Sequence, residues 1–268
     1  MSRVRRGLLG LLVLVVFAGV FSRTSAQGTP PAITPPSPPE PANPRISYRL
    51  EPVTAAALTK LYSPAQLGIL EKLNRRDVEH LARLKEMIVP EAWPAEPADS
   101  DELEYAVLPA TWEWATERNK AIVVLQPEQV FGAYEFGKLV RWGPVSSGRK
   151  ETFTPAGTFN LTWKTKSRTS TDNDQWLLKW YFNFINSRGI SFHQFELPGY
   201  AASHACVRLL ERDAIWLYNW GEQWKLAPGG REVLQQGTVV VVSGQYGHDK
   251  PGPWTSTDWW TQLPINLK

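Results

Sequence analysis

The apolar positions between residues 63 and 89 recur at the spacing of an α-helix. Leucines from Leu67 to Leu73 line one face, and a second apolar series runs from Val78 to Ile88 before Pro90. The start, Ser63-Pro64-Ala65-Gln66, combines a capping serine, a proline at the first helical position and a glutamine able to reach back to the cap. The pattern predicts two short helices with a break near residues 74–75.

From Glu113 onward the pattern is that of β-strands. Thr158 to Trp163 alternates strictly between polar and apolar residues, which predicts a half-buried strand. Residues 164–175 are polar and predict an exposed loop, and Asp213 is placed to cap a helix that runs to about Trp224. Since strands dominate, we expect a mainly β sandwich or barrel rather than a βαβ sheet. The other expected elements are strands over residues 121–125, 190–195 and 239–242, and a hairpin over residues 130–146 that turns at Glu135-Phe136-Gly137-Lys138.

The N-terminal residues carry the features of an export signal. A basic region with three arginines precedes the apolar run Gly7–Phe21, and small residues end the segment at Ala26. This run of fifteen residues is shorter than the roughly 20 that a membrane span needs. We therefore predict a signal peptide over residues 1–26 that is cleaved after export; an uncleaved N-terminal anchor is the alternative. The expected location is the periplasm or cell wall, with no stable membrane span after processing.

Composition divides the rest of the chain into three parts. Residues 27–45 are a proline-rich linker, because proline fixes φ, removes a backbone donor and favours extended segments without a core. Residues 46–112 are expected to form a small helical N-terminal segment, and residues 113–268 a β-rich catalytic domain with a C-terminal tail. The stretch from Leu70 to Pro90 resembles the second half of a LysM wall-binding module, although the strand that opens such a module is not evident. A helical cap packed on the main domain is the alternative.

Charge and composition narrow the choice of partners. The net charge is +3 and there is no dense block of lysine and arginine, which argues against a nucleic-acid partner. A weakly basic exported protein is compatible with an anionic polymer such as a cell wall. Thirteen tryptophans fit either a sugar-binding surface or a packed core, and the sequence does not separate the two. No cofactor and no metal are expected, and the oligomeric state stays open.

Cys206 is the only cysteine of the chain, so it has no intramolecular disulfide partner. The thiolate is the nucleophilic form of cysteine, and a nearby imidazole lowers the thiol pKa and accepts its proton. If residues 203–208 are extended, His204, Cys206 and Arg208 share a face, because alternate residues of a strand point the same way. An adjacent strand that carries His193 then brings a second imidazole alongside. The sequence thus predicts a nucleophile, a base and an anion anchor in one place.

Three segments around this cysteine resemble one protein family. Ser203-His204-Ala205-Cys206-Val207-Arg208 is similar to the SHGC(I/V)R signature of the L,D-transpeptidase catalytic domain, also called the YkuD family. The stretch TPAGTF, from Thr154 to Phe159, looks like the TPxGxF strand start of that family, and Gly237 to Val241 looks like its closing strand. The resemblance spans roughly residues 119–243 and keeps the order of the three segments.

This resemblance implies an L,D-transpeptidase-like β-sandwich that acts on peptidoglycan stem peptides. In this family the cysteine, here Cys206, cleaves an L,D bond of a donor stem peptide, holds the acyl group and passes it to an amine acceptor. His193 occupies the position of the general base. Stem peptides are therefore the implied partners, and the implied activity is that of a cysteine-dependent acyltransferase.

The remaining site residues have supporting roles in this interpretation. His204 and Ser203 neighbour the nucleophile and support it, while Arg208 and Gln194 are assigned to substrate binding; Arg208 either holds a substrate carboxylate or braces the cysteine segment. Ala205 and Gln194 depart from the family, in which glycine is usual before the cysteine and glycine or serine after the upstream histidine. Because a methyl group crowds a backbone with φ > 0, we expect either negative φ at Ala205 or neighbouring loops that have moved, and unchanged or lower activity in Ala205→Gly.

Three alternative functions stay open at this point. The same acyl-enzyme could give its acyl group to water or to a protein amine, which makes a cysteine peptidase or a protein-to-wall ligase. A zinc-binding protein with His193, His204 and Cys206 as ligands is the second, although the sequence shows no fourth ligand and no helical HExxH pattern. A wall-binding module that has kept the fold without catalysis is the third.

Overall fold

The computed structural model describes residues 47–54, 57–93, 103–171 and 173–267. The predicted signal peptide over residues 1–26 and the proline-rich linker over residues 27–45 lie outside these ranges, so both stay predictions. Within the described ranges, no helix is both long and apolar enough to cross a membrane.

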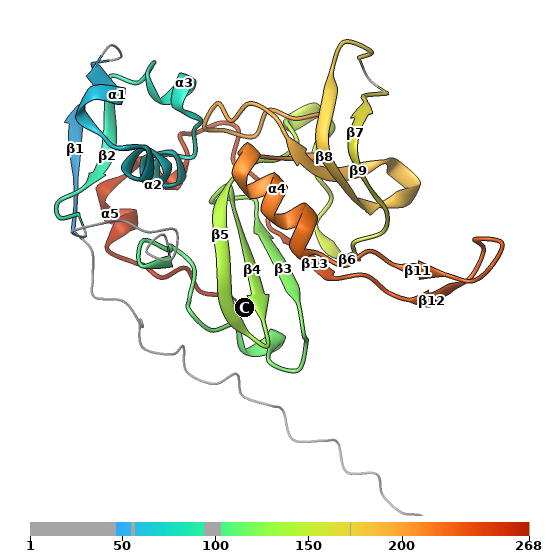
Figure 1. Ribbon diagram of the computed structural model, residues 1–268. Helices are drawn as coiled ribbons and strands as arrows, with labels where there is room; N and C mark the ends of the chain where they lie inside the picture. The colour runs from blue at the N-terminus through green and yellow to red at the C-terminus, as the bar shows by residue number, and fades with distance from the viewer. Residues whose placement is uncertain (1–46, 55–56, 94–102, 172, 268) are drawn as a thin grey trace, which may run out of the picture. The chain divides into compact units, whose positions relative to one another are not determined.

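Strands dominate the described chain, which confirms the expected mainly β fold, and nine strands form one large sheet (Figure 1). They are, in chain order, β3 (Ala121–Leu125), β4 (Val130–Glu135), β5 (Lys138–Ser146), β6 (Gly157–Asn160), β7 (Lys164–Thr169), β8 (Leu177–Ile185), β9 (Ile190–Gln194), β10 (Val207–Leu209) and β13 (Val239–Ser243). Across the sheet the order is β6-β13-β3-β4-β5-β10-β9-β8-β7. Neighbouring strands are antiparallel, except that β13 runs parallel to β3 and β10 runs parallel to β9.

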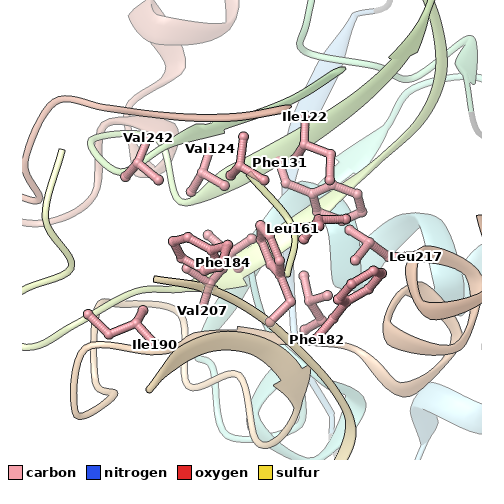
Figure 2. Close-up of a cluster of buried hydrophobic side chains, with 14 of the residues drawn as sticks. Ile122, Val124, Phe131, Leu161, Phe182, Phe184, Ile190, Val207, Leu217 and Val242 are labelled. Carbon is pink, nitrogen blue, oxygen red and sulfur yellow. The ribbon is translucent and has the colours of Figure 1, made fainter. Parts of the chain in front are cut away.

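The sheet curls so that its two halves face each other across one apolar core. Ile122 of β3 and Val242 of β13 point into this core from one half, and Phe182 of β8 and Val207 of β10 from the other (Figure 2). Leu217, from helix α4 (Glu211–Trp220), completes the cluster. Alternate residues of a strand point to opposite faces, so each of these strands still has a second face for other contacts.

The prediction of an exposed loop over residues 164–175 is wrong for the first half of this stretch. Lys164–Thr169 is strand β7, which pairs with β8. Strand β7 is the last in the sheet order, and no residue in it is buried. An edge strand that is solvated on both faces shows no apolar alternation, so the sequence pattern could not reveal it. Strand β8 was also not predicted. The expected hairpin is confirmed: β4 and β5 pair across a turn at Phe136 and Gly137, which have φ of 46° and 76°.

Helix α4 begins at Glu211, with Leu210 as its N-cap, so the expected cap at Asp213 is wrong. Asp213 lies in the first turn of the helix and is fully buried. Its carboxylate is 2.8 Å from the guanidinium of Arg141 on β5. Because a buried charge needs a partner, Asp213 attaches the helix to the sheet instead of starting it.

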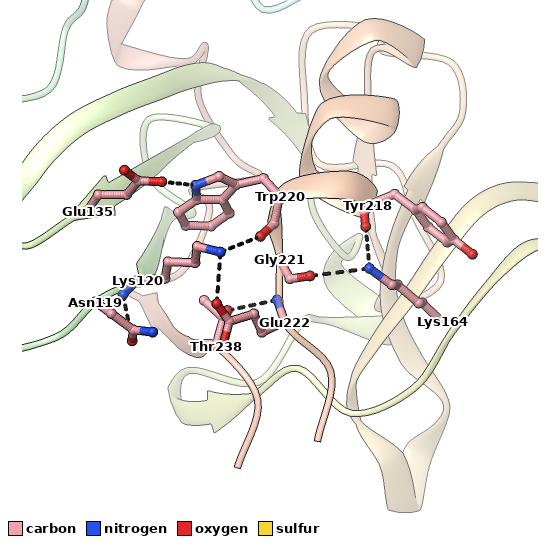
Figure 3. Close-up of polar contacts among 9 residues, drawn as sticks. All are labelled: Asn119, Lys120, Glu135, Lys164, Tyr218, Trp220, Gly221, Glu222 and Thr238. Carbon is pink, nitrogen blue, oxygen red and sulfur yellow. Dashed lines mark hydrogen bonds and ion pairs between the residues drawn. The ribbon is translucent and has the colours of Figure 1, made fainter. Parts of the chain in front are cut away.

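Two lysines hold the carbonyl groups at the C-terminal end of α4 (Figure 3). Lys120 Nζ donates to the Trp220 carbonyl at 3.0 Å, and Lys164 Nζ donates to the Tyr218 carbonyl at 2.6 Å. Cations are favoured at a helix C-terminus, where the last carbonyl groups lack helical partners. Gly221 is extended, with ψ of 147°, so the helix stops at Trp220 and does not reach Trp224.

The described residues between 46 and 112 are not purely helical. The prediction of a second helix over the apolar series from Val78 to Ile88 is partly wrong. Glu86–Pro90 is strand β2, which pairs antiparallel with β1 (Tyr48–Pro52). The run Met87–Val89 is buried, and such a short apolar run suits a strand as well as a helix. The described elements between the two strands are α1 (Leu58–Leu61), α2 (Pro64–Asn74) and α3 (Val78–Leu81).

Helix α2 is confirmed, together with the predicted break after it. Ser63 accepts a hydrogen bond from the Gln66 backbone N–H while the Gln66 side chain accepts one from the Ser63 backbone N–H, which completes a capping box. Arg75 then takes a left-handed conformation, with φ of 58°, and ends the helix. The chain therefore turns at this point and continues into α3.

A second apolar core lies on the other face of strands β3 to β5. Val123 and Trp142 of the sheet share it with Leu73 of α2 and Ile88 of β2, and with Trp254 from the C-terminal segment. The described parts of residues 46–112 and of the C-terminal segment thus pack against the sheet. Whether residues 46–112 serve as a cap or as a wall-binding module stays a prediction. The remaining short elements are β11 (Lys225–Leu226), β12 (Val233–Gln235), α5 (Thr257–Trp260) and the 3₁₀ turns Glu113–Ala115, Lys150–Thr152, Asn186–Arg188 and Pro253–Thr255.

Candidate active site

Two adjacent parallel strands bring the predicted site residues together. In the pairing of β9 with β10, Val207 lies opposite Phe192 and Arg208 opposite His193. Phe192 and Val207 point into the core between the two halves of the sheet. His193 and Arg208 are therefore on the other face, side by side.

Cys206 directly precedes β10 and is partly exposed. Continuing the register by one residue places it level with Ser191, and its Sγ atom is 3.5 Å from Ser191 Oγ and 3.9 Å from the Gly189 carbonyl oxygen. The sequence analysis did not assign Ser191 a role. The signal that could have found it is the alternation of β9, because Ser191 and His193 lie on the same face.

His193 is held in its neutral form. Its side chain is buried, and Nδ1 is 3.0 Å from the Gln194 carbonyl oxygen. A carbonyl only accepts, so Nδ1 carries the proton and Nε2 is left able to accept one. Burial lowers the pKa of His193 from 6.5 to about 4; the hydrogen bond to Gln194 opposes this shift and the positive charge of Arg208 adds to it. At neutral pH the ring is uncharged, as a general base must be.

Five predicted site residues line one narrow pocket of about 30 Å³. Trp176 and Phe195 contribute its aromatic walls. The predicted residues that line it are Cys206, His193, His204, Ser203 and Arg208.

Gln194 is not part of this pocket. It lines a separate groove together with Glu79 and Glu211, and Cys206 does not line that groove. Consecutive residues of a strand point to opposite faces, so the residue after His193 points away from it. The geometry does not support the assignment of Gln194 to substrate binding beside the cysteine.

The sequence analysis considered an extended conformation for residues 203–208. In the structure, the segment before Cys206 is a turn instead. Strand β10 starts only at Val207, and Ala205 has φ of 77°. The expectation of negative φ at Ala205 is therefore wrong: alanine takes the left-handed conformation that glycine adopts without cost. Since the turn is set by hydrogen bonds on both sides of Ala205, the conformation is imposed on this residue.

Those hydrogen bonds identify a residue that the sequence analysis did not assign. Thr154 Oγ1 donates to the Ala205 carbonyl at 2.8 Å and accepts from the Gly148 N–H at 2.8 Å. Ser203 Oγ donates to the Cys206 carbonyl. Thr154 opens the TPAGTF stretch, so the motif itself was the available signal: its threonine fixes the turn that presents the cysteine.

His204 lies in this turn and does not share a strand face with Cys206. Its ring packs against Trp176, with ring centroids 5.2 Å apart, and its Nδ1 atom is buried without a hydrogen-bond partner among the described residues. Arg208 is buried to 9% exposure, with its guanidinium 4.5 Å from the centroid of the Phe195 ring. Burial lowers the pKa of Arg208, while Glu196 acts in the opposite direction. The supporting role of His204 and the anion-holding role of Arg208 stay predictions.

A larger groove of about 590 Å³ is also lined by Cys206. Trp163 and Tyr181 stack in its wall with ring centroids 4.9 Å apart, and the Arg168 guanidinium lies 5.2 and 5.3 Å from those two rings. Arg188 also lines the groove. Arg168 lies in the polar stretch predicted to be a loop, and no sequence motif connects it with the cysteine.

The described ranges contain no group of three or more histidine, cysteine, aspartate or glutamate side chains placed to hold a metal ion. His193 Nδ1 faces a backbone carbonyl, and His204 packs against an indole. The zinc alternative, with His193, His204 and Cys206 as ligands, therefore finds no preformed ligand set in this geometry.

The fold and the site define a mainly β domain with a cysteine and a neutral histidine beside each other on one face of a curled sheet. Residues 119–242 match the family model of the L,D-transpeptidase catalytic domain, YkuD. The resemblance seen in the sequence is thus confirmed over residues 119–242, which make up less than half of the chain.

Solved L,D-transpeptidase structures are similar to part of this chain. One from Stackebrandtia nassauensis is 24% identical with a TM-score of 0.39, over 48% of this chain and 58% of that one. One from Mycobacterium tuberculosis H37Rv is 23% identical with a TM-score of 0.37, over 47% and 58%. One from Mycobacterium smegmatis is 17% identical with a TM-score of 0.37, over 47% and 59%. The matched part thus spans less than two thirds of each of these chains. No curated protein sequence matches the chain.

Proposed function

We propose that this protein is an exported peptidoglycan L,D-transpeptidase that works through an acyl-enzyme on Cys206. The observation that carries the proposal is the neutral, buried His193, which lines the same pocket as the partly exposed cysteine. The family of residues 119–242 supports the reaction class. Export rests on the sequence features of residues 1–26.

The first half of the proposed reaction forms a thioester. His193 Nε2 takes the proton of the Cys206 thiol, and the thiolate attacks the carbonyl carbon of the L,D peptide bond. We expect backbone N–H groups of the turn at Ala205 and Cys206 to stabilise the developing oxyanion. When the tetrahedral intermediate collapses, the C–N bond breaks, and the leaving amine takes the proton from His193.

The second half reverses these steps with a different amine. The acceptor amine attacks the thioester carbonyl and gives a proton to His193, the C–S bond breaks, and the thiolate regains its proton. The groove that contains Arg168 and Arg188 has room for a stem peptide and offers cations for its carboxylates, whereas the narrow pocket does not have that room.

Intact-mass measurement after incubation with a stem tetrapeptide tests this proposal. We expect a covalent adduct on the wild type that lacks the terminal D-residue, and none on Cys206→Ser, because a serine hydroxyl is far less ionised near neutral pH than a thiol. Adding an acceptor amine should convert the adduct into a cross-linked product. Release to water alone would favour the peptidase, and a Ser variant with activity within about tenfold of the wild type would exclude Cys206 as the nucleophile.

A further inference from the structure

The loop from Phe195 to Ala205 connects the proposed base to the proposed nucleophile. Strands β9 and β10 are parallel, so the chain must cross from one end of the pair to the other, and this loop makes the crossing. The position of the turn at Ala205 therefore depends on what holds the loop.

The half of the loop near the nucleophile is held by the main sheet. Ser146, at the end of β5, donates from Oγ to the Tyr200 carbonyl at 2.7 Å and accepts from the Ala202 N–H at 3.1 Å. Thr154 holds the Ala205 carbonyl, as described above. In the other half of the loop, next to His193, the main sheet contributes the hydrogen bond from the Phe195 N–H to the Leu209 carbonyl at 3.2 Å, and the residues that follow are held from elsewhere.

That other half is held by the N-terminal segment, through two consecutive residues between α2 and α3. The Asp77 N–H donates to the Leu197 carbonyl at 3.1 Å, and the Leu197 N–H donates to Asp77 Oδ2 at 2.7 Å. Arg76 Nη1 donates to the Pro198 carbonyl, and the two residues form an antiparallel bridge. Leu197 is fully buried, so without Asp77 its N–H has no access to water.

Arg76 also occupies the space beside Gly199. A Cβ atom at Gly199 would come within 2.6 Å of the Arg76 guanidinium, and Gly199 has φ of 88°. The glycine is thus required both by the turn and by the close approach of Arg76. The contact between the N-terminal segment and the loop is specific in shape as well as in hydrogen bonding.

We propose that Arg76 and Asp77 are positioning residues for catalysis, and that the N-terminal segment acts as a brace on the loop between His193 and Cys206. The inference rests on the proposed cysteine–histidine chemistry and goes beyond it. A cap that only covers apolar surface needs no polar contact with this loop. Here paired hydrogen bonds reach the loop main chain four residues after the base, where a shift moves the turn relative to the imidazole.

Asp77→Ser separates bracing from helix capping. Asp77 Oδ1 accepts from the His80 N–H at 2.9 Å and caps α3, while Oδ2 holds Leu197. Serine still caps a helix but is too short to reach the loop. We expect kcat for acyl transfer to fall about tenfold with KM unchanged, since small displacements of reacting groups are costly. The pH profile of Cys206 alkylation by iodoacetamide should also change, with slower reaction near neutral pH, because a displaced imidazole accepts the thiol proton less readily.

Ser63→Ala is the matched control. It removes the N-cap of α2 in the same segment without touching the loop, so it lowers stability while leaving kcat within about twofold of wild type and the alkylation profile unchanged. Arg76→Lys is the second variant, because it keeps the charge and loses the geometry of the contact with Pro198. We expect it to behave as Asp77→Ser does.

The proposal is overturned if Asp77→Ser and Arg76→Lys match Ser63→Ala in both kcat and the alkylation profile. The alkylation needs no stem peptide, so it remains informative even if the wild type forms no acyl adduct. If the wild type forms no acyl adduct but the alkylation profiles of Asp77→Ser and Arg76→Lys differ from that of the wild type, the transpeptidase function is contradicted. The proposal that Arg76 and Asp77 position the loop is then still supported.

Discussion

Ala205 shows that an alanine can occupy a backbone conformation that glycine usually adopts. The turn has the positive φ of a glycine position, and Thr154 and Ser203 fix its carbonyl groups. The methyl group of Ala205 is buried at the edge of the core. The residue therefore combines a conformational cost with a packing gain, and these two effects oppose each other.

For Ala205→Gly we expect nearly unchanged stability. Relief of the left-handed strain is worth roughly 1–2 kcal/mol. It is offset by the loss of one buried methyl group, about 0.8 kcal/mol, and by the added freedom of the unfolded chain, about 0.5–1 kcal/mol. Urea unfolding should show a change below about 1 kcal/mol, whereas Ala205→Val should lose roughly 2 kcal/mol or more, because a β-branched residue at positive φ is strained.

Acylation of Cys206 in Ala205→Gly should be several-fold faster than in the wild type, because glycine reaches the reactive turn without strain. This replaces the expectation of unchanged or lower activity that followed from a negative φ. A slower glycine variant, measured with one activated substrate at fixed pH, would show that the methyl group itself supports the turn.

His193 makes stability depend on pH. Its pKa is lowered from 6.5 to about 4 in the folded state, so the unfolded chain binds the proton first as the pH falls. Stability is thus highest above pH 6.5 and is lost as the pH drops toward 4. At pH 4.5 the loss is on the order of 2–3 kcal/mol. Urea unfolding of the wild type and of His193→Gln at pH 7 and pH 4.5 checks this prediction. Between these two pH values, the free energy of unfolding of the variant should fall by about 2–3 kcal/mol less than that of the wild type. An equal fall in both proteins would contradict the neutral state of His193.

At the scale of elements, strand β7 and its neighbour β8 supply a wall of the groove beside Cys206. Trp163 and Tyr181 stack, Arg168 lies over both rings, and Trp163 Nε1 donates to Asn186 Oδ1 at 2.9 Å. These contacts restrict the wall to one arrangement, so an anionic ligand meets a preformed cation.

Arg168→Gln should raise KM for a stem peptide about tenfold with kcat unchanged, which corresponds to the loss of one charge-assisted hydrogen bond, about 1.4 kcal/mol. An effect on KM alone indicates binding that is equal in the ground state and the transition state. Lys166→Gln, on the same strand but not lining the groove, is the charge-matched control. Similar KM values for both variants would show that only overall charge matters.

At the scale of the whole molecule, the sequence predicted the parts that depend on local pattern. The capping box of α2 and the hairpin turn at Phe136-Gly137 are determined by nearby residues. The Cys206 motif likewise identified the domain. The rest depends on distant contacts: β2 is a strand because β1 pairs with it, and Ala205 takes positive φ because Thr154 holds it. No pattern within a short stretch of sequence contains this information.

The two-sided burial of strands β3 to β5 has a consequence for where this protein can be cut. The family match ends at residues 119 and 242, but the face of the sheet with Val123 and Trp142 is covered by segments outside those limits. A fragment trimmed to the recognised domain exposes this apolar face to water, and contiguous patches of that kind drive self-association. The boundaries of family likeness are thus narrower than the boundaries of the unit that covers both faces of the sheet.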